Sequence, residues 1–150
     1  MNNRKLIIGI TIVILIVVFS MIGVKMVEKN SYITEKYYNE IFDSAITIYG
    51  EVSAILMYET QKEIDSVKKE VKKIINNIEV LETNFETKEG EEIISEIMLS
   101  ANEAIRLQEE KISGSDTYNF KDSQKAIDSV EAGLKEIEKV MNEKEIKFTR

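Results

Sequence analysis

The apolar residues of this chain follow three successive patterns. An unbroken run of nineteen uncharged residues extends from Leu6 to Val24, and a segment that is apolar around most of a helix follows at 37–58. From Ile64 onward the apolar residues recur with the 3-4 spacing that is typical of one face of a packed helix. We therefore predict an all-α fold with an N-terminal transmembrane helix, a long helix, and an antiparallel helical bundle with coiled-coil-like packing.

The first apolar run has the length and composition of a membrane span. As a helix it extends about 28 Å, close to the hydrocarbon thickness of a bilayer. Fourteen of its nineteen residues are Ile, Leu, Val or Phe. The run is longer than the roughly 7–15 residues usual in a cleaved signal peptide, and no A-x-A site follows it. We predict residues 6–26 to be a transmembrane signal anchor behind a short basic cytoplasmic tail, residues 1–5.

The charges that flank this span favour one orientation only narrowly. Arg4 and Lys5 precede it, while Lys25 and Lys29 follow it, so the positive-inside comparison is almost even. A short basic tail ahead of the span is the usual arrangement of an anchor with a cytoplasmic N-terminus. We therefore predict a single-pass protein of the cell membrane, with its C-terminal domain outside the cytoplasm.

Residues 60–150 are predicted to form the helical bundle domain. The helical pattern is interrupted at 84–90 and again around Gly114, which stands where a left-handed residue would end a helix. Three amphipathic helices result. Their inner faces carry, in chain order, Ile64, Val67, Val71, Ile74, Ile78, Leu81 and Phe85; then Ile94, Ile97, Ala101, Ala104, Ile105, Gln108 and Ile112; and finally Ile127, Val130, Leu134, Ile137 and Met141.

Two residues of this region depart from the apolar pattern. Gly133 lies inside the last helix, where a glycine costs about 1 kcal/mol relative to alanine, and we interpret it as a site of close helix packing. Gln108 is a polar residue on an apolar stripe. A register-setting position or a position at the solvent edge explains it without a ligand.

The segment between the span and the bundle, residues 27–59, is predicted to be an apolar juxtamembrane stalk. Lys and Arg are absent from 37–61, and apolar residues cover all but a narrow polar strip of the helix. Because such a helix must be buried against something, we predict an interaction surface on it. Its candidate residues are Tyr38, Phe42, Ile48, Tyr49, Val52, Ile55, Leu56 and Tyr58.

Two arrangements would bury this segment. In the first, a helix that is continuous over 34–83 stands beside a three-helix bundle, and a second copy or a membrane-protein partner covers its lower part. In the second, the chain folds back near Glu59 and makes a four-helix bundle. Thr60 to Glu63 fits a capping box, but no Gly, Asn or Pro supplies a turn, so we favour the continuous helix.

The composition excludes most kinds of catalytic and metal site. The chain contains no His, Cys, Trp or Pro, which removes the common zinc sites, thiol nucleophiles and serine–histidine triads. Adjacent carboxylates such as Glu91 and Glu92 flank one another and do not converge as calcium ligands must. We predict that the protein is not an enzyme and uses no cofactor or metal.

The charge and the apolar segment together suggest what kind of partner to expect. Beyond residue 25 the chain carries 17 basic against 27 acidic residues, a balance that repels nucleic acid. The leading hypothesis is a membrane-anchored interaction or scaffold protein that associates through helix 37–58 with itself or with a membrane partner. The alternative is a ligand-binding or sensory accessory bundle, with a small molecule held between helices near Tyr49 and Tyr58.

Overall fold

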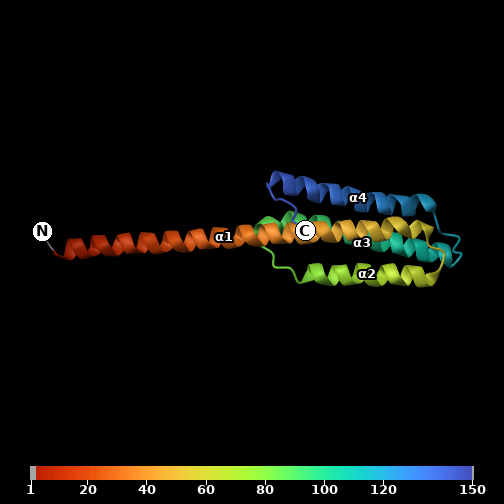
Figure 1. Cartoon of the computed structure of the whole chain (residues 1–150), viewed down its shortest axis with the longest axis horizontal. Coiled ribbons are helices and arrows are strands. Elements are labelled where there is room, and N and C mark those ends of the chain that lie inside the picture. The colour runs from red at the N-terminus through yellow and green to blue at the C-terminus, as the bar shows by residue number, and fades with distance from the viewer. Residues whose placement is uncertain (1–2, 150) are drawn as a thin grey trace. The chain divides into compact units, whose positions relative to one another are not determined.

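The computed structural model describes residues 3–149, and the side chains of residues 19–149. The elements in that range are all helical, which confirms the predicted fold class for the described chain (Figure 1). In chain order they are α1 (Asn3–Ala54), the 3-10 helix η1 (Ile55–Met57), α2 (Gln61–Glu79), the 3-10 helix η2 (Phe85–Thr87), α3 (Lys88–Ile112) and α4 (Phe120–Glu143). The chain divides into two compact units, Met1–Ile33 and Thr34–Arg150.

The first unit contains the N-terminal part of α1. Residues 6–18, which make up most of the predicted anchor, lie outside the residues whose side chains the structure describes, as does the predicted tail, residues 1–5. Among the residues that are described, no helix is long and apolar enough to cross a membrane. The anchor and its orientation therefore stay predictions from the sequence.

The second unit is a four-helix bundle. The last part of α1, then α2, α3 and α4, run alternately in opposite directions (Figure 1). The continuous helix predicted over 34–83 is therefore wrong, and the four-helix alternative is confirmed. Because this unit begins at Thr34, the segment 37–58 is one of the bundle's own helices, and no domain boundary separates a stalk 27–59 from the bundle at residue 60.

The turn between α1 and α2 is built without Gly, Pro or Asn. After η1 tightens the end of α1, Tyr58 and Thr60 adopt extended backbone conformations. The Thr60 hydroxyl accepts a hydrogen bond from Glu63 N, and the Glu63 carboxylate accepts one from Thr60 N, which completes the capping box. The buried side-chain amide of Gln108, on α3, donates to the Tyr58 carbonyl at 2.7 Å. Gln108 therefore holds this turn in place and does not lie at the solvent edge.

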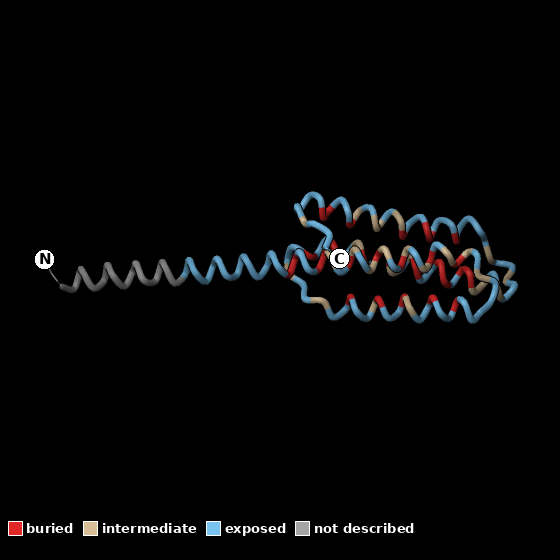
Figure 2. The backbone as a smooth tube through the Cα atoms, viewed as in Figure 1, coloured by how far each residue is buried: buried red, intermediate tan, exposed pale blue. Residues whose placement is uncertain are grey.

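The core of the bundle consists of the apolar stripes predicted from the sequence together with a stripe of α1 (Figure 2). The five seam residues of α2, from Ile64 to Ile78, are all buried. α1 adds the buried residues Tyr37, Tyr38, Ile41, Ala45, Ile48, Val52 and Ile55. The predicted seam ends with α2, because Leu81 is only half-buried and Phe85 is exposed.

Small residues allow α3 and α4 to approach each other closely. A Cβ atom at Gly133 would overlap Cγ1 of Ile97, well inside van der Waals contact, so the interpretation of Gly133 as a packing glycine is confirmed. Ala101, Ala104 and Ala126 on these two helices are also buried. At the end of α3, Gly114 has a φ of +70°, the left-handed conformation predicted for it.

Candidate functional site

The eight residues predicted to form an interaction surface lie within the bundle. Four of them are fully buried, namely Tyr38, Ile48, Val52 and Ile55. The other four are half-buried and pack against the core, namely Phe42, Tyr49, Leu56 and Tyr58. Because the chain folds back after α1, its own helices cover this stripe. The predicted association through helix 37–58 is therefore corrected: the stripe is core, not a surface open to a partner.

Tyr38 has a structural role where α1 meets the start of α3. Its hydroxyl accepts a hydrogen bond from Gly90 N at 3.2 Å and donates one to the Glu86 carbonyl at 3.4 Å. Thr87, the N-cap residue of α3, makes no side-chain capping bond, so Tyr38 satisfies one of the amides left free at that helix end. Burial raises the pKa of Tyr38 and that of its neighbour Tyr37. This tyrosine pair belongs to the core and to a helix cap.

The other aromatic candidates also make contacts inside the bundle. The Tyr49 hydroxyl donates a hydrogen bond to the Glu131 carboxylate of α4 at 3.4 Å. The Phe42 ring packs edge to face on Phe148, with 5.0 Å between the ring centroids. Neither Tyr49 nor Tyr58 lines either of the two surface hollows considered next. The contacts of these side chains therefore support a structural role in the bundle.

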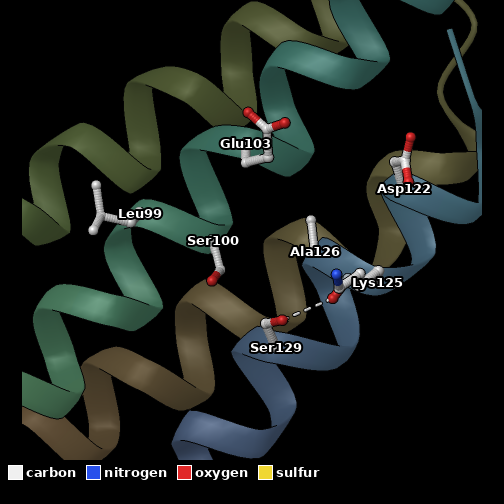
Figure 3. A pocket seen from close by; sticks show the side chains of 7 residues that line it. All are labelled: Leu99, Ser100, Glu103, Asp122, Lys125, Ala126 and Ser129. Atoms are coloured by element: carbon white, nitrogen blue, oxygen red, sulfur yellow. Dashed lines mark hydrogen bonds between the residues drawn. The ribbon is translucent and has the colours of Figure 1, made fainter.

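The α3 and α4 helices form a continuous groove on the bundle surface, which we call the α3–α4 groove. It consists of two hollows of about 410 and 550 Å³ that share Leu99, Ser100 and Ser129. Figure 3 shows the residues that line the first of them. The first hollow is also lined by Glu103, Asp122, Lys125 and Ala126, and the second by Ile93, Glu96, Ala132, Gly133 and Glu136.

The groove follows from the sizes of the side chains along these two helices. The lining residues recur at helical spacing, over 93–103 on α3 and over 122–136 on α4. Where the two hollows join, Ser100 and Ser129 are too small to fill the space between the helices. Leu99 of α3, which also lines both hollows, has 69% of its surface exposed, and in Figure 3 its side chain points away from Ser129 and α4. A large apolar side chain thus stands next to a recess made of small ones.

Two of the four carboxylates that line the groove are in ion pairs. Arg106 donates to both carboxylate oxygens of Glu103, at 2.7 and 2.8 Å, and these bonds lower the pKa of that carboxyl. Lys139 donates to the Glu136 carboxylate at 2.7 Å. The groove is lined by four carboxylates and one lysine, a net charge of −3, and Arg106 also pairs with Glu110 outside the lining. The ion pairs reduce the repulsion of a second acidic molecule here but do not cancel it.

Comparisons with known proteins do not assign this chain to a family. No protein-family model matches it, and no curated protein or solved structure matches it at a significant level. Within the described part of the chain, no cluster of three His, Cys, Asp or Glu side chains could hold a metal ion. The case for a function therefore rests on the geometry of the α3–α4 groove.

The spacing of apolar residues does not predict this groove, although the sequence holds one feature of it. Leu99 lies outside the inner stripe of its helix, but a single exposed apolar residue is common on protein surfaces and becomes informative only beside a recess. Ser129 and Ala132 also face outward on α4. Small residues between charged ones resemble an ordinary solvated face, so their part in a recess is visible only in the folded bundle.

Proposed function

We propose that this protein is a single-pass, membrane-anchored scaffold component whose bundle lies outside the cytoplasm and pairs with a second copy through the α3–α4 groove. The observation that carries the proposal is the exposed Leu99 side chain beside the recess at Ser100 and Ser129. The anchor is supported by the uncharged run from Leu6 to Val24. The pairing replaces the association through helix 37–58.

A face that carries both a protruding side chain and a recess is complementary to a second copy of itself. When a two-fold axis passes through the middle of the groove, Leu99 of each copy enters the recess of the other. Pairing then removes this leucine from water on both copies, which is the main source of favourable free energy in such a contact. Helices on both sides of the interface can pack with their side chains interlocked.

The groove is long enough for several helical turns of contact. The stretch of α3 from Ile93 to Glu103 extends about 15 Å, and that of α4 from Asp122 to Glu136 about 21 Å. An anchor confines the copies to the plane of one membrane and so raises their effective concentration. A contact of modest area is then sufficient to pair them.

The pairing is expected to add to a monomer that folds without it. The apolar stripes of all four helices are already covered within one chain. Leu99 and Ser129 are exposed and contribute no buried surface to that core. Substitutions in the groove should therefore change association without unfolding the bundle, which allows the two effects to be measured separately.

Disulfide cross-linking tests the proposal cleanly because the chain has no native cysteine. In membranes of cells that express the full-length Leu99→Cys variant, mild oxidation should yield a covalent dimer, because residues near the two-fold axis lie within disulfide distance. The control is Asn77→Cys, an exposed position on α2. It carries the same anchor, so it reports cross-linking that is caused only by crowding. Equal rates of dimer formation in the two variants would overturn the proposal.

A further inference from the structure

Two large apolar side chains are exposed on the connection between α2 and α3. Val80, at the C-cap of α2, has 81% of its surface exposed, and Phe85, the first residue of η2, has 92%. The heptad pattern predicts Phe85 on the inner face, and this prediction is wrong because the folded chain turns the side chain outward. We call residues 80–85 the apolar loop. Its exposed side chains make no contribution to the core of the bundle.

Hydrogen bonds fix the backbone that presents Phe85. The Asn84 side chain accepts a hydrogen bond from Glu86 N at 2.8 Å, and the Thr87 hydroxyl accepts one from Asn84 N at 3.0 Å. The Asn84 amide also donates to the hydroxyl of Thr34, on α1, at 3.0 Å. The outward position of Phe85 is therefore a property of the folded bundle.

The contact with Thr34 limits how far the apolar loop can lie from the predicted anchor. That anchor is predicted to end at residue 26. At no more than about 3.5 Å per residue, the chain from 26 to 34 spans at most about 28 Å, whatever the orientation of the two units. The tether is therefore short enough to hold the loop near the membrane interface, where the headgroup layer adds about 5–7 Å beyond the hydrocarbon.

We propose that Val80 and Phe85 insert at the boundary between the headgroups and the acyl chains of the membrane that holds the anchor, so that a lipid surface covers the apolar loop. This inference rests on the anchor proposed above. Aromatic and aliphatic side chains gain free energy when they leave water for the interface. Because the turn already fixes the backbone at Phe85, little conformational freedom is lost when this side chain enters the membrane. With the anchor as the first attachment, the loop supplies a second one.

The charges beside the loop determine which lipids it favours. Glu79, Glu82 and Glu86 are acidic, and Lys88 is the one basic residue between 79 and 88. Anionic headgroups repel this surface, whereas zwitterionic phosphatidylcholine does not. We therefore expect insertion into phosphatidylcholine membranes, weaker insertion when anionic phosphatidylglycerol is added, and recovery at high salt as the repulsion is screened.

Tryptophan fluorescence of the full-length protein in vesicles tests the inference, because the native chain has no tryptophan. The Phe85→Trp variant is reconstituted into phosphatidylcholine that contains brominated acyl chains, which quench tryptophan on contact. The matched control is Phe120→Trp, which is also exposed but lies at the opposite end of α3. The 25 residues of α3 separate the two ends by about 37 Å.

The inference predicts that the Phe85→Trp emission shifts to the blue and loses most of its intensity in brominated vesicles, while Phe120→Trp emission does neither. If the protein floats with the vesicles but the two variants are quenched equally, the inference is overturned while the proposed anchor is still supported. Protein that does not float with the vesicles overturns the anchor and this inference with it. Quenching that increases with phosphatidylglycerol content would contradict the lipid preference.

Discussion

The hydroxyl of Tyr38 on α1 lies 3.2 Å from the backbone nitrogen of Gly90 on α3 and accepts its hydrogen bond. A Cβ atom at Gly90 would come within 3.0 Å of Cε1 of Tyr38, so the absence of a side chain allows the ring to reach the helix end. The contact joins residues that are 52 positions apart in the chain. It shows that a tyrosine of the apolar segment 37–58 caps a helix inside the monomer.

Removal of the Tyr38 hydroxyl should therefore weaken the bundle. We expect Tyr38→Phe to lower the free energy of unfolding by about 1 kcal/mol, because the buried Gly90 amide loses its partner while the ring keeps its packing. Urea unfolding followed by circular dichroism measures the change. Tyr32→Phe is the control, since Tyr32 is 66% exposed. The same small effect from both variants would contradict the capping role.

The tyrosine pair also predicts a loss of stability at alkaline pH. Burial raises the pKa of Tyr37 and Tyr38 above the ordinary value of 10.0. A raised pKa means that folding favours the protonated form, so this stabilisation is complete below pH 10.0 and declines as the pH rises above it. Unfolding in urea at a series of pH values should show a shallower alkaline decline for Tyr37→Phe than for the wild type. If the free energy of unfolding declines identically in both proteins, the titration of Tyr37 does not contribute to the alkaline loss of stability.

Two glycines in helices should respond to alanine in opposite directions. Gly133→Ala should destabilise the bundle by about 1–3 kcal/mol, because the new Cβ overlaps Ile97 and forces α3 and α4 apart. Gly50→Ala on α1 should stabilise it by up to about 1 kcal/mol, because no atom lies within 4 Å of the new Cβ and alanine favours the helix. Thermal unfolding of both variants checks the pair. A higher unfolding temperature for Gly133→Ala than for the wild type would contradict the close packing of α3 on α4.

Carboxylates on the buried face of α1 should unfold the monomer. Ile48 and Val52 are fully buried, and an unpaired carboxylate there would have to leave water at a cost of several kcal/mol. We expect the double variant Ile48→Glu/Val52→Glu to lose most of its helical circular dichroism. The control is Thr47→Glu/Ser53→Glu, which alters exposed neighbours on the same helix. Retention of full helicity in the first double variant would show that this face is not core.

The helical pattern of the distal region could be predicted from the sequence because local spacing determines it. The seam from Ile64 to Ile78, the end of α3 at Gly114 and the packing glycine Gly133 all follow from periodicity or from the backbone freedom of glycine. The turn after α1 could not be predicted in this way. One of its contacts, from Gln108 to the Tyr58 carbonyl, spans 50 residues and exists only in the folded bundle.

The candidate site was harder to predict than the fold. An apolar helix such as 37–58 must be buried, but the sequence does not say whether the covering surface belongs to the same chain. The structure shows that it does. The groove depends on the distance between α3 and α4 and on the small size of Ser100 and Ser129, and these features have no signature in hydrophobic spacing.

The mass of the full-length protein in detergent micelles tests the central claim, pairing through the α3–α4 groove, most directly. We predict that sedimentation equilibrium gives a dimer for the wild type and a monomer for Ser129→Glu/Ala132→Glu, with unchanged thermal unfolding of the bundle. Both positions are exposed in the monomer, so the carboxylates disturb only the recess that receives the partner's leucine. A monomeric wild type at all protein concentrations, or a dimer that the double variant leaves intact, would contradict the account.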